Sequence, residues 1–173
     1  MIAPKKRITI LLKTGILMAA ALPQVQSNAA VPTSSAQFGP SNPFYAPSTL
    51  PLQAPPFDKI KDSDYQPAIE AGMAQQREEV RAIAENSDPP TFENTLVALE
   101  KSGQLFNRVN LVFNAVTGAN LSPELEKLQE IEAPKLAAHK DAIFLDSRLF
   151  QRVEAIYKQR ESLKLDSESG RLV

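Results

Sequence analysis

The sequence predicts an all-α fold, made of about five long antiparallel helices that follow an extended, proline-rich arm. From residue 62 onward, apolar residues recur every three or four positions, which is the period of an amphipathic helix. Ser, Thr or Asp stands directly before several of these stretches, where its side chain can cap free backbone amides. No stretch shows the alternation of apolar and polar residues that is typical of a strand.

Residues 1–29 are predicted to be a signal peptide. The segment begins with the basic residues Lys5, Lys6 and Arg7. An apolar stretch over residues 8–22 follows, and small residues then favour cleavage near Ala29, with a second candidate position near Ala36. An uncleaved anchor is the weaker alternative, because Lys13 interrupts a run shorter than the roughly 20 apolar residues that span a bilayer. We expect an exported, periplasmic protein with no membrane attachment after cleavage.

Residues 30–61 are predicted to form an extended arm, because their many prolines remove amide donors and exclude a helix. This segment also contains the aromatic residues Phe38, Phe44, Tyr45 and Phe57, which are unusual in a solvated linker. We expect the arm from about Asn42 to lie on a larger body with these rings docked. A flexible tether is the alternative, and it is the expectation for residues 31–41.

The first helix is predicted over residues 63–86, and the second begins after Thr91, whose hydroxyl can accept the amides of the first turn. Its apolar stripe continues without interruption to Gly118, so a single helix of about seven turns is expected. Within these helices, Gly72 and Gly103 cost stability relative to alanine, and we expect them to permit close helix–helix approach.

Three further helices are expected. Ser122 is predicted to cap the third helix, in which Pro134 should cause a kink or a break. Asp146 is predicted to cap the fourth helix, and Asp166 or Ser167 to begin the fifth. The loops between helices are short, which favours antiparallel neighbours. We expect Phe150 and Tyr157 of the fourth helix to pack against the aromatic stripe of the second, formed by Phe92, Phe106 and Phe113.

The composition excludes several classes of function. The chain has 173 residues with 19 basic and 20 acidic side chains, and four of the basic ones lie in the leader, which has no acid. An acidic body without a basic stripe argues against nucleic acid as a partner. The sequence contains no cysteine, which excludes disulfides, thiolate nucleophiles and Cys-ligated zinc or iron–sulfur clusters.

No catalytic, cofactor-binding or metal-binding residue is predicted. His139 is the only histidine, whereas a hydrolytic zinc needs three protein ligands, so we expect His139 to lie near the free carbonyls of a helix C-terminus. The acid pairs Glu78/Glu79 and Glu130/Glu132 are interpreted as solvated helix surface rather than catalytic carboxylates. The glycines are isolated, so no phosphate-binding loop is expected, and no serine lies in a nucleophile turn.

Several motifs carry a resemblance to a known family. The most specific is Pro-Thr-Phe-Glu-Asn-Thr at residues 90–95, and others are Asn-Pro-Phe at 42–44, Pro-Pro-Phe-Asp-Lys-Ile at 55–60 and Ala-Pro-Lys-Leu-Ala-Ala-His at 133–139. Over residues 42–172 the chain resembles the N-terminal region of bacterial peptidyl-dipeptidases and oligopeptidase A, which are thimet oligopeptidase-like zinc metallopeptidases. The leader points to the exported peptidyl-dipeptidase branch.

The resemblance implies a large, mostly helical enzyme of two lobes around a deep channel, with the N-terminal helices forming part of the channel wall. Such enzymes bind zinc with a His-Glu-x-x-His helix and a downstream glutamate, and they release dipeptides from the C-terminus of oligopeptides. No position of this chain matches a zinc ligand, so none is carried over. We expect residues 62–173 to be a partial lobe, truncated before the C-terminal catalytic portion and inactive alone.

A second hypothesis belongs to a different class. The acidic body and the long helices are also compatible with a stand-alone periplasmic module that binds peptides or proteins without catalysis. A cooperatively melting, monodisperse mature chain would favour this module. Exposed apolar surface and a tendency to aggregate would favour part of a larger enzyme.

Overall fold

A computed structural model describes residues 37–172, all of which belong to the second of two compact units, residues 34–173. The predicted signal peptide, residues 1–29, and both predicted cleavage positions, Ala29 and Ala36, lie outside the described residues. Within residues 37–172 all regular structure is helical, which confirms the all-α prediction. No helix in this part of the chain combines the length and apolarity needed to cross a bilayer.

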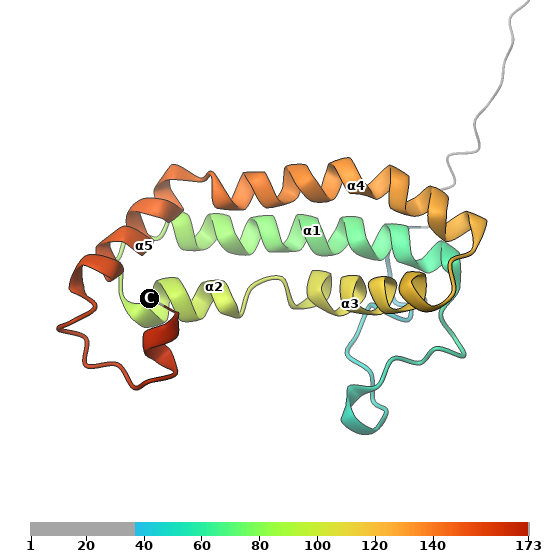
Figure 1. Ribbon diagram of the computed structural model, residues 1–173, viewed down its shortest axis with the longest axis horizontal. Coiled ribbons are helices and arrows are strands. Elements are labelled where there is room, and N and C mark those ends of the chain that lie inside the picture. The colour runs from blue at the N-terminus through green and yellow to red at the C-terminus, as the bar shows by residue number, and fades with distance from the viewer. Residues whose placement is uncertain (1–36, 173) are drawn as a thin grey trace, which may run out of the picture. The chain divides into compact units, whose positions relative to one another are not determined.

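Four helices longer than two turns form the body. They are α1 (Asp62–Ala84), α3 (Gln104–Ala119), α4 (Pro123–Phe144) and α5 (Ser147–Gln159). Helix α1 lies between α3 and α4 (Figure 1). Helix α4 runs in the same direction as α1, and α5 continues beyond the end of α4 (Figure 1). At one end Ser122, the cap of α4, donates to Asp62 of α1 at 2.9 Å, and at the other end Arg148 of α5 donates to Glu85, the C-cap of α1, at 2.8 Å.

The predicted helix caps are confirmed. The Thr91 hydroxyl accepts the Asn94 amide at 3.1 Å, and the Ser122 hydroxyl accepts the Leu125 amide at 3.1 Å. The Asp146 carboxylate accepts two amides of the first turn of α5, at 2.9 and 2.8 Å. Each side chain satisfies donors that have no partner inside the helix, which fixes where the helix begins.

The prediction of a single long second helix is wrong. The segment is divided into η2 (Phe92–Val97, a π-helical turn), α2 (Ala98–Glu100) and α3. Gly103 has φ +69°, a left-handed conformation that glycine adopts at little cost, and its amide donates to the Glu79 carboxylate at 2.7 Å. Gly103 is therefore a helix breaker. Its surroundings are also tightly packed, since a Cβ atom at this position would lie 2.3 Å from the Gln76 side-chain amide nitrogen.

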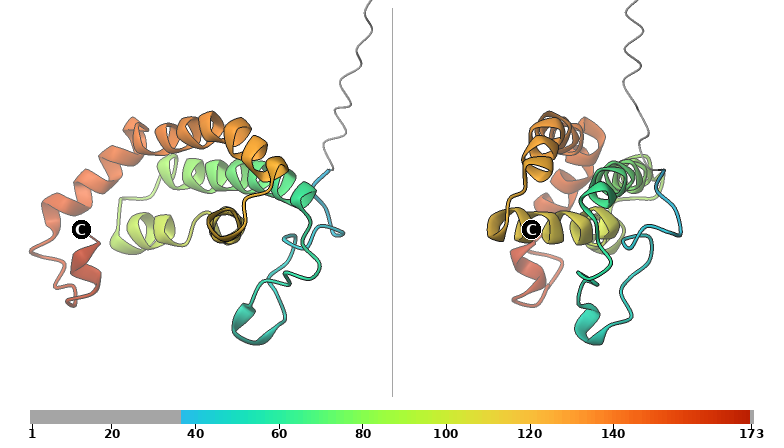
Figure 2. Two further views of the ribbon diagram at one scale, coloured as in Figure 1. Left: turned by 45° about the vertical axis from the view of Figure 1, so that its right-hand side comes forward. Right: turned by 90° about the vertical axis from the view of Figure 1, so that its right-hand side faces the viewer.

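The later helices differ from the prediction in two details. Pro134 does not split α4, whose ribbon is curved but continuous (Figure 2). The predicted fifth helix is only the short 3₁₀ turn η3 (Ser169–Arg171) within the described residues. Asp166 does act at its start, because its carboxylate accepts the Glu168 and Ser169 amides at 2.9 and 2.8 Å.

The arm is docked at its beginning and projects further along. Phe44 is buried, and its carbonyl accepts a hydrogen bond from Arg108 at 2.8 Å. Asn42 ties the arm to α1 by donating to the Asp64 carbonyl at 3.0 Å. The tip contains the 3₁₀ turn η1 (Pro51–Gln53) and exposes Leu52 completely, and Phe57 is also exposed. The expected docking of aromatic rings thus holds for Phe44 but not for Phe57.

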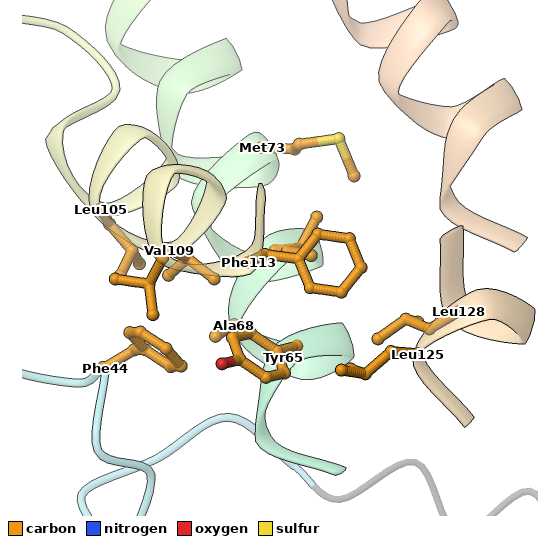
Figure 3. Close-up of a cluster of buried hydrophobic side chains, with 11 residues drawn as sticks. Phe44, Tyr65, Ala68, Met73, Leu105, Val109, Phe113, Leu125 and Leu128 are labelled. Carbon is orange, nitrogen blue, oxygen red and sulfur yellow. The ribbon is translucent and has the colours of Figure 1, made fainter. Parts of the chain in front are cut away.

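The main core lies where the arm, α1, α3 and α4 meet (Figure 3). Phe44, Tyr65 and Phe113 form a chain of rings, with centroid distances of 5.5 and 5.2 Å. Leu125 and Leu128 of α4 close this core from the other side. A smaller cluster at the opposite end of α1 is formed by Val80, Ile83, Ala84 and Leu149.

Candidate functional site

Polar side chains gather between α1 and α4 in an otherwise apolar interface. We call this group the α1–α4 polar cluster, and its members are Gln66, Glu70, Gln76, Glu132, Lys135 and His139. No sequence pattern predicted this cluster. It contains the buried titratable side chains of Glu132 and His139, a combination that can mark a functional site.

The interpretation of Glu132 as solvated surface is wrong. Its side chain is 0% exposed, because it lies on the face of α4 that packs against α1. The carboxylate oxygen Oε1 accepts hydrogen bonds from Gln66 at 3.2 Å and from Lys135 at 2.7 Å. The second oxygen, Oε2, is buried without a hydrogen-bond partner. Glu130, two residues earlier, is exposed as predicted.

Lys135 links the two helices electrostatically. Its ammonium group pairs with Glu132 on its own helix and with Glu70 on α1. Burial lowers the pKa of Lys135, but hydrogen bonds and charge interactions with the two carboxylates outweigh this effect, and the net pKa is raised. Lys135 therefore stays charged at neutral pH.

The prediction that His139 lies at a helix C-terminus is also wrong. His139 is 3% exposed and lies inside α4, which continues to Phe144. Its Nε2 atom is 2.8 Å from Gln76 Oε1, and its ring meets Phe106 edge-on at 5.0 Å. Burial, together with the positive charge of Arg77, lowers the pKa of His139. His139 is thus a neutral interior side chain whose Nδ1 atom has no partner.

A pocket of about 550 Å³ opens beside this cluster, lined by Glu70, Met73, Arg77, Lys135, Ala138 and His139. Its charged groups are mixed in sign, and its imidazole is engaged through Nε2. The described residues hold no group of three or more His, Cys, Asp or Glu side chains that could bind a metal. They do not fit a catalytic zinc, which needs three protein ligands and an open position. The contacts of the cluster join the two helices through Glu132 and His139.

A second polar centre surrounds the motif at residues 90–95. Arg152 of α5 is buried, and it donates to the carbonyls of Asn86 and Asp88 at 2.8 and 3.1 Å and to the Asn94 side chain at 2.9 Å. Asn94 also accepts the Thr91 amide at 2.8 Å and donates to the Pro89 carbonyl at 3.0 Å. Asn94 therefore connects the α1–η2 loop, the helix cap and α5, which is a structural role.

The sequence could have revealed part of the α1–α4 polar cluster. Glu132 and His139 are seven positions apart, and Leu125 and Leu128 lie on the same face of α4 at helical spacing. A polar residue on an apolar face needs a buried partner. The partners Gln66 and Gln76 come from a helix more than 60 residues away, so they could not be identified from spacing alone.

Two curated relatives are similar to most of this chain. A dipeptidyl carboxypeptidase of Salmonella typhimurium is 50% identical over 133 residues, which are 77% of this chain and 20% of that protein. A dipeptidyl carboxypeptidase of Escherichia coli is 50% identical over 132 residues, which are 76% of this chain and 19% of that protein. The match lies in the N-terminal part of both relatives, so this chain spans about one fifth of their length. No family model matches the chain.

Proposed function

Because this chain is related to the dipeptidyl carboxypeptidases along most of its length, as its motifs predicted, we propose that it forms the N-terminal helical region of a peptidyl-dipeptidase. The half-identical sequence over 133 residues carries this proposal. In it, residues 62–172 are a scaffold that forms part of the wall of a peptide-binding channel. Catalysis requires a further portion of polypeptide.

The contacts of the buried polar groups support a scaffolding role. Glu132 and His139 are each fixed by a glutamine of α1, and Arg152 fixes the loop before η2. Buried polar groups that are bound in this way define the register of neighbouring helices. A rigid, precisely registered helical body is what the wall of a channel for short peptides requires.

The proposed enzyme acts on oligopeptides and releases dipeptides from the free C-terminus. Its zinc would be bound by residues outside those described here, since the described ones provide no ligand set. The one histidine is buried and hydrogen-bonded through Nε2, so it cannot provide even a first ligand without opening the α1–α4 interface. The residues of this chain would position and enclose the peptide rather than cleave it.

Export to the periplasm is part of the proposal and rests on the leader sequence alone. Basic residues followed by an apolar stretch and small residues are typical of a secretory signal. Measuring the mass of the mature N-terminus tests this point. A mature chain that begins after Ala29 or Ala36 is the expected result, and an intact Met1 in the exported fraction contradicts it.

A segment exchange tests the proposed function. Residues 42–172 of this chain replace the matched stretch of the Escherichia coli relative, and release of dipeptides from a C-terminally free peptide is followed by mass spectrometry. We expect the exchanged enzyme to be soluble and active, because half of the residues are identical and the core residues come from one chain. The unmodified relative is the positive control, and a version without the stretch is the negative control.

Two results would contradict the proposal. One is an exchanged enzyme that melts cooperatively but releases no dipeptides. The other is an exchanged enzyme that does not fold under conditions in which the unmodified relative does. Either result would show that this helical body does not take the place of the matched region.

A further inference from the structure

Helix α5 has two apolar faces, but only one of them is covered by the described residues. Leu149, Arg152 and Ile156 are buried against α1 and η2, at i, i+3 and i+7 spacing. Phe150, Val153 and Tyr157 repeat the same spacing one position later. Phe150 is 63% exposed and Tyr157 is 50% exposed. The expectation that these two rings pack against the aromatic stripe of the preceding helices is therefore wrong.

The second face forms a groove together with η2. We call it the α5 groove; it measures about 320 Å³ and is lined by Leu96, Phe150, Val153, Glu154 and Tyr157. Leu96 at its base is buried, and Val153 is half-buried. A single exposed aromatic ring needs no explanation, but two rings at helical spacing over a buried leucine form a continuous apolar surface.

The charges around the α5 groove neutralise one another. Glu154 pairs with Lys158 at 2.9 Å, and Arg160, whose guanidinium lies 4.3 Å from the centre of the Tyr157 ring, pairs with Glu161 at 3.5 Å. A net charge at the rim would favour a partner of opposite charge, as at many nucleic-acid or acidic-peptide sites. The α5 groove has none, so its recognition depends on apolar contact.

We propose that the α5 groove is the docking surface for an apolar helix of the remaining portion of the full-length peptidyl-dipeptidase. This inference rests on the proposed function and names where the two portions meet. Side chains at i, i+3 and i+7 match the ridge of a second helix packed alongside. The relatives are about five times longer than the matched stretch, so they contain enough polypeptide to supply this helix.

The location of the α5 groove agrees with this occupant. Helix α5 continues away from the end of the α1–α4 pair (Figures 1 and 2), so one side of it is free of the described helices. The main core lies among the arm, α1, α3 and α4 and is already enclosed. The α5 groove therefore offers apolar surface at the edge of the helical body, where a following helix can pack without displacing any described contact.

The test combines two measurements on the exchanged enzyme and on the 173-residue chain. Radical footprinting reports the labelling of Phe150 and Tyr157. We expect labelling to be strong in the chain alone and several-fold weaker in the exchanged enzyme. Unchanged labelling of both rings in an exchanged enzyme that is active would overturn the docking surface while leaving the proposed function intact.

A matched pair of variants provides the second measurement. Phe150→Glu places a charge in the α5 groove, whereas Gln151→Glu places the same charge on the next, exposed position of the same helix. We expect Phe150→Glu to lower the melting temperature of the exchanged enzyme by several degrees and to leave that of the 173-residue chain unchanged. Gln151→Glu should change neither. Equal effects of the two variants would contradict the proposal.

Two other outcomes are also decisive. If labelling of Phe150 in the chain alone falls as protein concentration rises, a second copy covers the α5 groove, and the proposed occupant is wrong. If the unmodified exchange yields no active enzyme, the proposed function fails and the docking surface fails with it. The first outcome is distinguished from the second because the exchanged enzyme remains active.

Discussion

Glu132 and Lys135 show how single residues join α1 to α4. A fully buried carboxylate is costly unless charged or polar partners satisfy it. Glu132 has two such partners on one oxygen, while the other oxygen has none. Glu132 therefore contributes to the register of α4 against α1 rather than to net stability. An apolar residue in the same place could pack without needing hydrogen-bond partners.

Substitution of Glu132 by alanine is expected to destabilise the chain by about 1–3 kcal/mol, because it leaves Gln66 and the buried side of Lys135 without their acceptor. In this variant Lys135, which is 39% exposed, still pairs with Glu70. The loss of stability should therefore be smaller than for a fully buried ion pair. Denaturant unfolding measures the change. Glu130→Ala, on the exposed side of α4, is the control and should stay within about 0.5 kcal/mol. Similar losses for both variants would show that Glu132 is not buried.

His139 is expected to make stability depend on pH. Burial lowers its folded-state pKa from the ordinary value of 6.5, so the unfolded chain binds a proton at this site more readily than the folded chain. The contribution of neutral His139 is therefore complete above pH 6.5 and is lost as the pH falls below that value. His139→Gln should reduce the loss of thermal stability between about pH 7 and pH 5. An unchanged pH dependence in this variant would contradict the burial of the imidazole.

At the residue scale, the sequence predicted the roles of capping residues better than those of titratable ones. Thr91, Ser122 and Asp146 act on amides within their own first turn, so their neighbours in sequence determine their contacts. Glu132 and His139 depend on glutamines of another helix. Their burial is a property of tertiary packing, which local sequence does not contain.

The packing of α1 on α3 depends on close backbone approach at Gly72. A Cβ atom there would lie 2.7 Å from the Phe106 Cα and 2.8 Å from its amide nitrogen, and the backbone cannot move aside locally. Gly72→Ala should therefore cost about 1–3 kcal/mol through overpacking. Gly118→Ala is the matched control in α3, where a Cβ would meet nothing within 4 Å.

The control should change stability in the opposite direction. Alanine is favoured over glycine in a helix interior, so Gly118→Ala should be neutral or stabilising by up to about 1 kcal/mol. Denaturant unfolding of both variants gives the comparison. Equal stabilisation by the two substitutions would mean that α1 and α3 do not meet at Gly72.

Docking of the arm is expected to depend on Phe44. Its ring enters the main core beside Tyr65, whereas Phe57 near the arm tip is exposed. Phe44→Ala should increase hydrogen exchange at the Tyr45 amide, which donates to the Asn42 carbonyl at 3.0 Å in the docked arm. Phe57→Ala should leave this exchange unchanged. If neither variant alters it, the arm is held by contacts other than the Phe44 ring.

At the scale of elements, the positions of most helices were predictable and the break at Gly103 was not. The apolar stripe continues across the break, because η2, α2 and α3 all contact α1. Helical periodicity therefore showed no interruption. The left-handed conformation of Gly103 is stabilised by its hydrogen bond to Glu79, a contact from a preceding helix that spacing could not indicate.

At the scale of the whole molecule, the described residues form a helical body with an unpartnered apolar groove on α5 and no ligand set for a metal. The similarity to dipeptidyl carboxypeptidases could be predicted because motifs such as residues 90–95 are local in sequence. The exposure of the second face of α5 could not be predicted, because Phe150 and Tyr157 have the same spacing as core residues. Which face of a helix is covered depends on polypeptide that packs against it.

The most direct test of a non-catalytic scaffold uses the purified 173-residue chain. The chain is loaded with zinc and dialysed, its metal content is measured, and it is then incubated with a C-terminally free oligopeptide while products are identified by mass spectrometry. We predict zinc well below one equivalent and no dipeptide release, since a hydrolytic zinc needs three ligands and this chain has one histidine, which is buried. One equivalent of tightly bound zinc together with release of C-terminal dipeptides would contradict the account.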